Sequence, residues 1–562
     1  MKLNKQLKNI VILSSVVATS LMASPTVPKI GDVLKEVQPP KIEREKKEIP
    51  KIKQQEQQVP KEFEDGKKIE VKKFLINGAV HLNNEELKAL VAPFENQELS
   101  FNQIQEITSS ITKKYREKGY FVARAYIPEQ NIFTQNGGLK INVVEGNYGK
   151  FNLENNSRVK DTMVQAVLDD IKDKNIVSSH TLERAMLIIN DMPGVQVNKA
   201  EVKPGEEVGT SDFVIGTEAT KAYNGYVIGD NYGSQYTGKH RIMAGIDFNS
   251  PFKIGDKISA FAMTSEKEGL LSGQLSYAFP IHPNGTRGEI KYSKTAYDLG
   301  SSYKELDAVG TSDSITARVS YPIIRTRLEN LNSYGEVSYN KMKDEIQSAN
   351  SVVKKDSYVA TLGLDYTKDS LLWSKNSQTR AGVSLTFGDL NFKEKADKTD
   401  DKNGANTQGN FSKINVELGK DIDLLENIKW ENSLQMQYAF GDKNLDGSQD
   451  LSTGGINGVK FYPDGEQSAE NGYIYNSELF YTLPVFLGLN SRVSAFYDIG
   501  RVYMSNNFSD EKSITLQDFG VGYYGSYKDF FVNTHLAHNI AHEVSSQDKY
   551  NNRVLVQAGW VF

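Results

Sequence analysis

Three histidines and a glutamate near the C-terminus are the first residues whose types suggest chemistry, because imidazole and carboxylate groups bind metals. They are His535, His538, His542 and Glu543. The segment around His535 and His538 alternates like a β-strand, in which positions 535 and 538 point to opposite faces. The spacing therefore argues against a shared metal ion.

An acidic stretch, 442–450, is the second candidate, and its Asp446-Gly447 step is similar to part of a calcium-binding loop. It lacks the glutamate at the spacing that such a loop requires. The chain has no cysteine, which excludes thiolate metal sites, disulfides and cysteine nucleophiles. Its glycine-rich stretches lack the Gly-Lys-Ser/Thr signature of a nucleotide-binding loop. With no nucleophile and base brought together, we expect no enzyme, bound metal or cofactor.

Length and composition bound the architecture that positions any site. The chain has 562 residues, which suggests several domains, and its formal net charge of −5 offers no basic surface for nucleic acid. No run of about 18 apolar residues follows the N-terminus, which excludes helical membrane spans. A polar average is compatible with a membrane barrel, because only alternate side chains face lipid.

The N-terminus has the pattern of a secretory signal. Three lysines precede a short apolar core, 10–22, and small residues at 23 and 24 offer a cleavage point. We expect residues 1–23 to be a signal peptide. Residues 24–38 contain one helical candidate, 30–37, which Pro39-Pro40 would end. Residues 39–66 are rich in Lys, Glu, Gln and Pro and cannot bury enough apolar surface to fold, so we expect a disordered linker.

Two stretches then share one order of elements, β-α-α-β-β. Residues 67–145 predict a strand, two helices and two strands, at 69–76, 84–92, from 100, 121–127 and 139–144. Ser100 and Gln103 have the spacing of a helix-capping box. Residues 146–217 repeat the order more loosely. The pattern predicts two tandem α+β modules, an arm rather than a catalytic domain.

From about 218 to 562 the helical period disappears, and short segments alternate apolar with polar or small side chains. Leu271 and Leu275, for example, would share one face of a strand, with Ser272 and Ser276 on the other. Sixteen candidate strands begin near residues 225, 239, 257, 271, 287, 313, 334, 357, 379, 412, 428, 473, 493, 514, 529 and 553.

An even number of antiparallel strands can close into a barrel with no unpaired edge in lipid. Connections after odd-numbered strands tend to be longer, including 389–411 and 441–472, which fits an outer-membrane barrel. The last strand places Trp560 and Phe562 on one face and ends in an aromatic residue. A soluble β-sandwich or propeller is the alternative.

Several motifs resemble those of one family, the TpsB transporters of two-partner secretion in the BamA-like superfamily, and the resemblance covers nearly the whole mature chain. Residues 28–34 stand where the family has a helix inside the barrel. The first module resembles a POTRA domain at 115–121, 125–130 and 143–146, the second at 182–185, 190–195 and 203–205. The barrel opens with the family-like Asp-Asn-Tyr-Gly-Ser at 230–234.

The resemblance implies the fold: a 16-stranded outer-membrane β-barrel, residues 218–562, preceded by two periplasmic POTRA domains, 67–145 and 146–217, and a plug helix, 24–38. It also implies the function, which is export without ATP of one unfolded TpsA-type partner, a haemolysin, adhesin or iron-acquisition protein. Further expected partners are outer-membrane lipid and, for biogenesis, the barrel-assembly machinery and periplasmic chaperones, with Trp560 and Phe562 as the assembly signal. The expected state is a monomer or weak dimer.

The partner-binding groove is expected between the second helix and the last strand of the first POTRA module. Its candidate residues are Ile104, Ile107, Ile111, Leu139, Ile141 and Val143. Packing inside the module's own core is the alternative for each of them.

The family's sixth extracellular loop folds back into the barrel and carries a Val-Arg-Gly-aromatic motif. The strand count places 441–472 in that loop, where the residues are Val459, Lys460, Phe461 and Tyr462, so that lysine replaces arginine and phenylalanine replaces glycine. The family's arginine pairs with the aspartate of an aromatic-x-Asp-x-Gly strand, matched here by Phe496, Asp498 and Gly500.

The resemblance thus implies a contact between Lys460 and Asp498, whose side chain the strand alternation turns inward. Lysine is a more mobile point charge than arginine, so we expect less geometric definition. Another loop cation such as Lys443, or none, is the alternative partner of Asp498. At the level of function the alternatives are a BamA-like insertase, which usually carries more periplasmic modules, and a simple diffusion porin, which would need neither arm nor plug.

Overall fold

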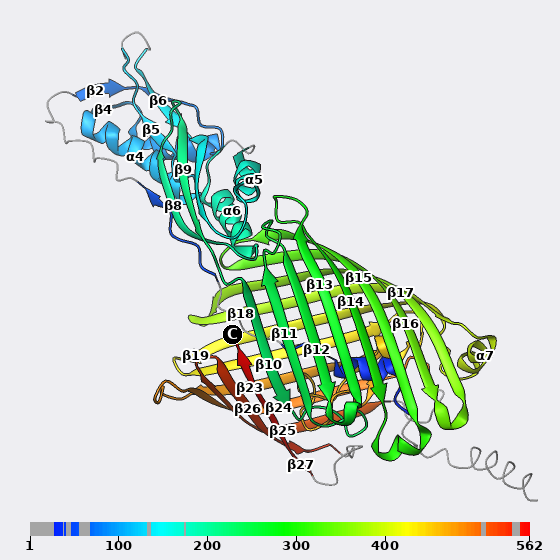
Figure 1. The fold of residues 1–562 in the computed structure, drawn as a ribbon. Helices are drawn as coiled ribbons and strands as arrows, with labels where there is room; N and C mark the ends of the chain where they lie inside the picture. The colour runs from blue at the N-terminus through cyan, green and yellow to red at the C-terminus, as the bar shows by residue number, and fades with distance from the viewer. Residues whose placement is uncertain are drawn as a thin grey trace, which may run out of the picture.

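The structure is a computed structural model, and it describes residues 27–37, 39–40, 47–54, 68–131, 136–172, 176–506, 513–541 and 551–562. Two α+β modules stand at one end of a large β-barrel (Figure 1). Within these described ranges no helix has both the length and the apolar character needed to cross a membrane. The expected signal peptide, 1–23, lies outside them.

The barrel closes from 16 antiparallel strands in the described part of the chain. They are β10 (Tyr223–Asp230), β11 (Arg241–Asn249), β12 (Lys257–Ser265), β13 (Leu270–Pro280), β14 (Arg287–Asp298), β15 (Ala308–Arg325), β16 (Glu329–Ile346), β17 (Ser351–Leu372), β18 (Lys375–Phe392), β19 (Gly409–Leu425), β20 (Ile428–Ala439), β23 (Asn471–Thr482), β24 (Asn490–Tyr503), β25 (Ile514–Tyr527), β26 (Phe530–Asn539) and β27 (Asn552–Val561). The first strand pairs with the last, from Tyr226↔Val561 to Asp230↔Gln557. The predicted fold class is confirmed.

Alternation along the strands separates an apolar outer face from a polar lumen. Leu271 and Leu275 are 57% and 56% exposed, as lipid-facing side chains must be when no lipid is present. Ser272 and Ser276 point inward and are buried, and the Ser272 hydroxyl lies 2.9 Å from that of Thr295. Strands β15 to β18 are longer than expected, because their pairing continues into polar segments. Local sequence does not distinguish such polar strand ends from loops.

Loop length divides the barrel into two ends. Turns at the end next to the modules, here the module end, include 373–374, 426–427 and 528–529. The longest connections lie at the opposite loop end and include 440–470 and 393–408, the latter containing the helix α7 (Lys395–Asn403). This asymmetry is the one that the sequence predicted.

In its described residues, 68–131 and 136–145, the first module contains β2 (Lys68–Val71), β3 (Lys73–Asn77), α3 (Asn84–Val91), η2 (Ala92–Phe94), β4 (Gln97–Ser100), α4 (Phe101–Glu117), β5 (Arg124–Tyr126) and β6 (Gly138–Val144). The capping box is present, because the Ser100 amide donates to Gln103 Oε1 at 2.8 Å and the Gln103 amide to Ser100 Oγ at 3.4 Å. The single strand expected at 69–76 is two strands, since β2 pairs with β4 whereas β3 pairs with β6.

The expected partner-binding groove is wrong as placed. All six candidate residues are buried in the module's own core, at 0–6% exposure, and they are Ile104, Ile107, Ile111, Leu139, Ile141 and Val143. An apolar face of α4 packs directly on the β3-β6-β5 sheet, so no open groove separates the helix from the strands.

The second module consists of β7 (Asn147–Asn156), α5 (Asp161–Lys172), α6 (Ser179–Asp191), β8 (Gln196–Pro204) and β9 (Thr210–Glu218). Its sheet has the order β1-β8-β9-β7, in which β1 (Lys53–Gln54) comes from the segment expected to be a linker. Ile49 is also buried in the core of this module. The prediction of disorder across 39–66 is therefore wrong for residues 47–54. Ile49 and Ile52 pack on the core of the second module, although the average composition of the segment is polar.

The helical candidate at 30–37 is observed almost over its expected length, within the described residues 27–37. Its helical part is α2 (Ile30–Val33), followed by one 3₁₀ turn, η1 (Leu34–Glu36). Figure 1 shows it in dark blue inside the barrel. Ile30 and Val33 are buried against lumenal side chains such as Met243, Met263 and Met342.

Candidate functional site in the barrel lumen

The connection between β20 and β23, residues 440–470, folds back into the barrel as a hairpin. Its two arms pair through β21 (Leu451–Ser452) and β22 (Ser468–Ala469), and a 3₁₀ turn, η7 (Gly447–Gln449), precedes them. We call residues 453–467 the loop tip. The tip is tied internally, for example by the Val459 amide, which donates to the Thr453 carbonyl at 2.8 Å.

The four motif residues are buried within the loop tip. Val459, Phe461 and Tyr462 are at most 1% exposed, and Lys460 is 6% exposed. Full burial of a tip on a long surface loop requires a surrounding wall that pairs its polar groups. The last five barrel strands, β23 to β27, supply that wall.

Lys460 and Asp498 form the contact that the resemblance implied. Lysine Nζ lies 3.0 Å from Oδ2 of Asp498 and 3.2 Å from Oδ1. The Asn476 side chain joins them, because its Nδ2 donates both to Asp498 Oδ1 and to the Gly458 carbonyl, each at 2.7 Å. Lys443 instead donates to two backbone carbonyls of the neighbouring loop, so it is not the partner of Asp498.

Each residue of the aromatic-x-Asp-x-Gly motif on β24 contacts the loop tip. The ring of Phe496 lies 4.3 Å below Lys460 Nζ, a cation–π arrangement. Gly500 lies where the tip comes closest, because a Cβ there would sit 2.9 Å from Cβ of Thr453. Sequence reasoning predicted these residues, and the structure brings all of them together around one buried lysine.

Lysine in place of arginine was expected to give the loop tip less geometric definition. Other contacts of the motif also hold the tip in place. The amide of Phe461, which stands where the family has glycine, donates to the Asp518 carboxylate on β25. Its carbonyl accepts from Arg553 on β27 at 3.2 Å. The hydroxyl of Tyr462 donates to Asn539 Oδ1 on β26 at 3.0 Å. Two main-chain contacts of Phe461 and the Tyr462 hydroxyl thus tie the tip to three strands, β25, β26 and β27.

A second lumenal network beside the pair was missed by sequence reasoning. Glu478 lies 3.9 Å from Lys460 and accepts from the hydroxyls of Ser494 and Tyr524, both at 2.6 Å. Tyr524 also bonds to Nε2 of His535 at 2.8 Å. His535 is thus part of the wall of this network.

The histidine run has no common ligand geometry in the described residues. His538 belongs to the other face of β26, where its ring lies 5.2 Å from that of Phe519. His542 and Glu543 lie outside the described residues. Across the described ranges no group of three or more potential ligands could hold a metal ion.

Arg241 on β11 holds the other side of the loop tip and also the end of the plug. Its guanidinium pairs with Asp230 on β10 at 2.9 Å and with Asp464 of the tip at 2.8 Å. The same group donates to the Glu36 carbonyl at 3.0 Å. Asp230 belongs to a motif quoted from the sequence, but nothing local to Arg241 distinguishes it from an ordinary strand arginine.

The plug and the loop also touch directly. Gly31 of α2 packs on η7 so closely that a Cβ at position 31 would lie 2.5 Å from the Ser448 amide nitrogen. The first amide of the helix, that of Ile30, donates to Asp344 Oδ1 on β16 at 2.7 Å, a contact that also suits the positive end of the helix. The lumen is therefore closed by two elements that pack on each other and bond to the wall mainly through side chains.

The C-terminal aromatics lie on the outer face, at the seam where the barrel closes. The rings of Trp560 and Phe562 are 4.5 Å apart, and Trp560 is stacked near Phe530. The backbone of Phe562 exchanges two hydrogen bonds with Gly225 on the first strand. Their role in assembly stays a prediction.

Glu36 is expected to make the seating of the plug depend on pH. Burial raises the pKa of Glu36 to about 7, although Thr237 and Arg241 partly oppose the change. A released plug would return the carboxyl to its ordinary pKa, so the seated plug holds the proton more tightly. The stability that this proton gives to the seated plug is fully present below the ordinary pKa of glutamate. It is lost as the pH rises through about 7. We expect channel openings in planar bilayers to become more frequent from pH 5 to pH 8, and Glu36→Gln to flatten the response. An unchanged pH response in Glu36→Gln would contradict this.

Comparison with known proteins gives two family matches. The model of the family described as haemolysin secretion/activation protein ShlB/FhaC/HecB matches residues 209–525, and that of the ShlB-type POTRA domain matches 69–146. Among curated proteins, the heme/hemopexin transporter protein HuxB of Haemophilus influenzae is 27% identical over 475 residues, which cover 83% of this chain and 82% of HuxB.

Two solved structures share the fold. CdiB from Escherichia coli superposes with a TM-score of 0.73 at 20% identity, covering 90% of this chain and 92% of that one. CdiB from Acinetobacter baumannii gives 0.64 at 15% identity, covering 92% and 95%. The similarity to both structures is a similarity of fold.

Proposed function

Because the chain belongs to the ShlB/FhaC/HecB family of haemolysin secretion/activation proteins, we propose that its periplasmic modules bind one unfolded secreted partner, which the barrel then exports without ATP. Members of this family are outer-membrane transporters of two-partner secretion, and their POTRA domains lie in the periplasm. The module end of the barrel is accordingly its periplasmic end, and the loop end faces outward.

The observation that carries the proposal is the construction of the closed lumen. Plug and loop tip fill it, yet neither belongs to the barrel sheet, and each bonds to the wall mainly through side chains such as Arg241, Asp344 and Asp498. Such elements can leave without breaking a strand pairing. A diffusion porin has no use for either element, and a BamA-like insertase usually carries more periplasmic modules than the two described here.

Energy for export need not come from a nucleotide. The partner shifts the population between plugged and open states by binding the open one more tightly. Its folding outside the cell would then make passage irreversible. Curated relatives differ in the cargo that their names give, as in heme/hemopexin transporter and hemolysin transporter, so we propose a single large secreted partner without choosing its class.

The chain itself must also reach the outer membrane and insert into it. We propose that periplasmic chaperones deliver it and that the barrel-assembly machinery inserts it, with the last strand and its Trp560 and Phe562 as the signal. Its wall then contacts outer-membrane lipid, and we propose a monomer or weak dimer as the working state.

The deciding experiment is secretion in a Gram-negative host that lacks the system. Each large signal-peptide-bearing protein found to be encoded near its gene is co-expressed with the chain as a candidate partner, and that candidate is measured in the culture medium. We expect it in the medium only when both are present. Partner retained in the periplasm, with altered assembly of other barrels, would support the insertase instead. Increased solute uptake without secretion would support a porin.

A further inference from the structure

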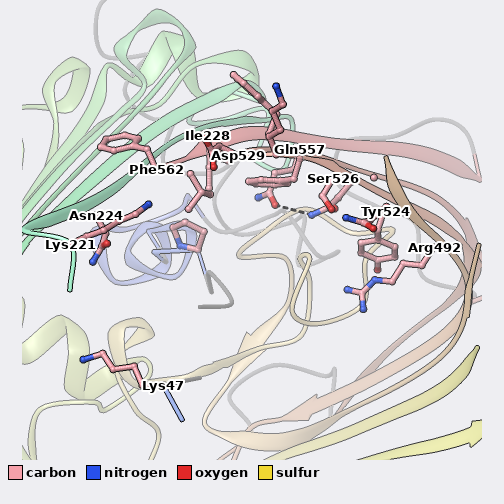
Figure 2. Close-up of a pocket in the computed structure, with 18 of the residues that line it drawn as sticks. Lys47, Lys221, Asn224, Ile228, Arg492, Tyr524, Ser526, Asp529, Gln557 and Phe562 are labelled. Atoms are coloured by element: carbon pink, nitrogen blue, oxygen red, sulfur yellow. Dashed lines mark hydrogen bonds between the residues drawn. The ribbon is translucent and has the colours of Figure 1, made fainter. Parts of the chain in front are cut away.

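A cavity of about 1220 Å³ lies at the module end of the lumen, between the second module and the barrel wall. Figure 2 shows Arg492 and Tyr524 on one side of it, with Lys221 and Asn224 on the other. Pockets for small molecules usually measure about 300–1,000 Å³. The space therefore suits an extended peptide better than a small ligand, and we call it the entrance cavity.

The charged side chains that line the entrance cavity are mostly cations, although the whole chain carries a formal net charge of −5. The cations are Lys47, Lys221, Lys257, Arg492 and Lys528, and the carboxylates are Asp191 and Asp529. Asp191 is already paired with Arg325 at 2.7 Å. Because a cleft lined mainly by one sign of charge concentrates its field, the entrance cavity favours an anionic ligand.

Arg492 on β24 is the cation whose geometry is prepared for such a ligand. Its guanidinium carbon lies 4.6 Å from the ring centre of Phe480 on β23 and 4.8 Å from that of Tyr524 on β25. Two aromatic rings restrict the motion of the side chain, so a ligand that binds it costs less conformational entropy. Within the described part of the chain, these ring contacts are accompanied by no hydrogen bond or ion pair to the guanidinium.

Other arginines that face the lumen already have carboxylate partners. Both terminal nitrogens of Arg380 donate to Asp421, at 2.6 and 2.7 Å, and Arg318 lies 3.6 Å from Glu336. The guanidinium of Arg492 points into the entrance cavity instead (Figure 2). A carboxylate that enters the cavity can therefore bind it through two parallel hydrogen bonds, as Asp421 binds Arg380.

From these contacts we infer that the entrance cavity binds acidic segments of the exported partner, with Arg492 binding an aspartate or glutamate carboxylate. This rests on the proposed export function and adds the chemical class of the segment that enters the barrel. Phe480 and Tyr524 are positioning residues, because they hold the guanidinium in place. The lysines of the lining attract the acidic chain without fixing its geometry.

The binding site lies close to the network around the loop tip but is separate from it. Tyr524, whose ring faces Arg492, donates its hydroxyl to Glu478 at 2.6 Å, and Glu478 lies 3.9 Å from Lys460 of the tip. Two side chains thus stand between the guanidinium and the tip. An acidic segment can occupy the entrance cavity while the tip is still seated, so its binding can be measured on the resting protein.

The test measures peptide binding to the purified full-length protein in detergent, by fluorescence anisotropy. The probe is a labelled twelve-residue peptide of glycine and serine that carries four glutamates and an amidated C-terminus. Its matched control has glutamine at the same four positions. We expect the wild-type protein to bind the glutamate peptide at least tenfold more tightly than the glutamine peptide, and added salt to reduce this preference.

Substitution of Arg492 tests the assigned residue. Arg492→Gln is expected to bring the affinities for the two peptides within threefold of each other. Arg492→Lys keeps the charge but not the planar fork, so an intermediate preference is expected. The matched control is Arg318→Gln, which removes a lumenal arginine that also stacks on a ring, 3.7 Å from the centre of Tyr334, but is already paired with Glu336. It should keep the wild-type preference.

Three outcomes would overturn the inference. They are equal binding of both peptides by the wild type, an undiminished preference in Arg492→Gln or Arg492→Lys, and equally tight binding of a glutamine peptide with a free C-terminal carboxylate. The last would assign the cavity to chain ends instead of acidic side chains. The peptide measurement does not depend on secretion. Absence of secretion by the wild type with every candidate partner would count against the proposed function, which keeps the two failures apart.

Discussion

Asp498→Asn is expected to reduce secretion of the partner at least tenfold and to make the loop tip accessible to trypsin at Lys460. Asp498 is fully buried, and Lys460 Nζ lies 3.0 Å from it. Asparagine keeps the size of the side chain but leaves the ammonium without its closest counter-charge. Breaking a buried ion pair in this way costs about 3–5 kcal/mol, enough to change the population of the seated tip by more than a hundredfold.

The matched control is Asp365→Asn on β17, which removes an ion pair with Arg318 whose partners are 55% and 35% exposed. Exposed pairs contribute little, so secretion and trypsin resistance should stay at the wild-type level. The double variant Lys460→Met, Asp498→Asn removes both charges and is expected to recover part of the loss, since no unpaired charge stays buried. If Asp498→Asn kept Lys460 resistant to trypsin and secreted normally, the pair would not hold the tip.

Gly31→Ala is expected to unseat the plug and to raise channel opening in planar bilayers at least tenfold. The added Cβ would sit 2.5 Å from the Ser448 backbone nitrogen on η7, and a backbone atom cannot turn aside as a long side chain can. Alanine is also a better helix former than glycine by about 1 kcal/mol. Helix propensity alone therefore predicts a firmer plug, so increased opening isolates the steric effect.

The control for this substitution is Gly335→Ala on β16, where the nearest atom to a new Cβ, a side-chain carbon of Leu362, is 3.5 Å away. It should leave conductance unchanged. Entry of a large antibiotic such as vancomycin into cells gives a second measure, with higher sensitivity expected only for Gly31→Ala. Wild-type conductance in Gly31→Ala would show that plug and loop do not depend on each other.

Plug and loop tip form one site. Arg241 bonds to both, and Gly31 touches η7 of the loop. Release of one removes contacts of the other, so the two elements are expected to respond together rather than as independent gates. The effects of Asp498→Asn and Gly31→Ala should accordingly be non-additive when combined.

Features that depend only on neighbours along the chain could be predicted from local sequence. Period-two alternation identified the barrel strands, and the Ser100–Gln103 spacing identified the start of α4. Strand alternation placed the Asp498 side chain inward, on the same face as Gly500, and the family resemblance then made its contact with the returning loop predictable.

Local sequence could not predict whether a given side chain is enclosed or solvated, because this depends on which distant surfaces pack together. The apolar face of α4 is the same sequence whether it lines a groove or a core, and only its packing on the sheet showed that Ile104 and Ile107 are enclosed. A polar side chain in the lumen, such as Arg241 or Glu478, looks like a solvated one until the barrel closes around it. The ordered segment 47–54 has a linker's composition. Its Ile49, Ile52 and Lys47 become anchors only because the second module presents a core and backbone carbonyls and the barrel presents Arg327 at the right places.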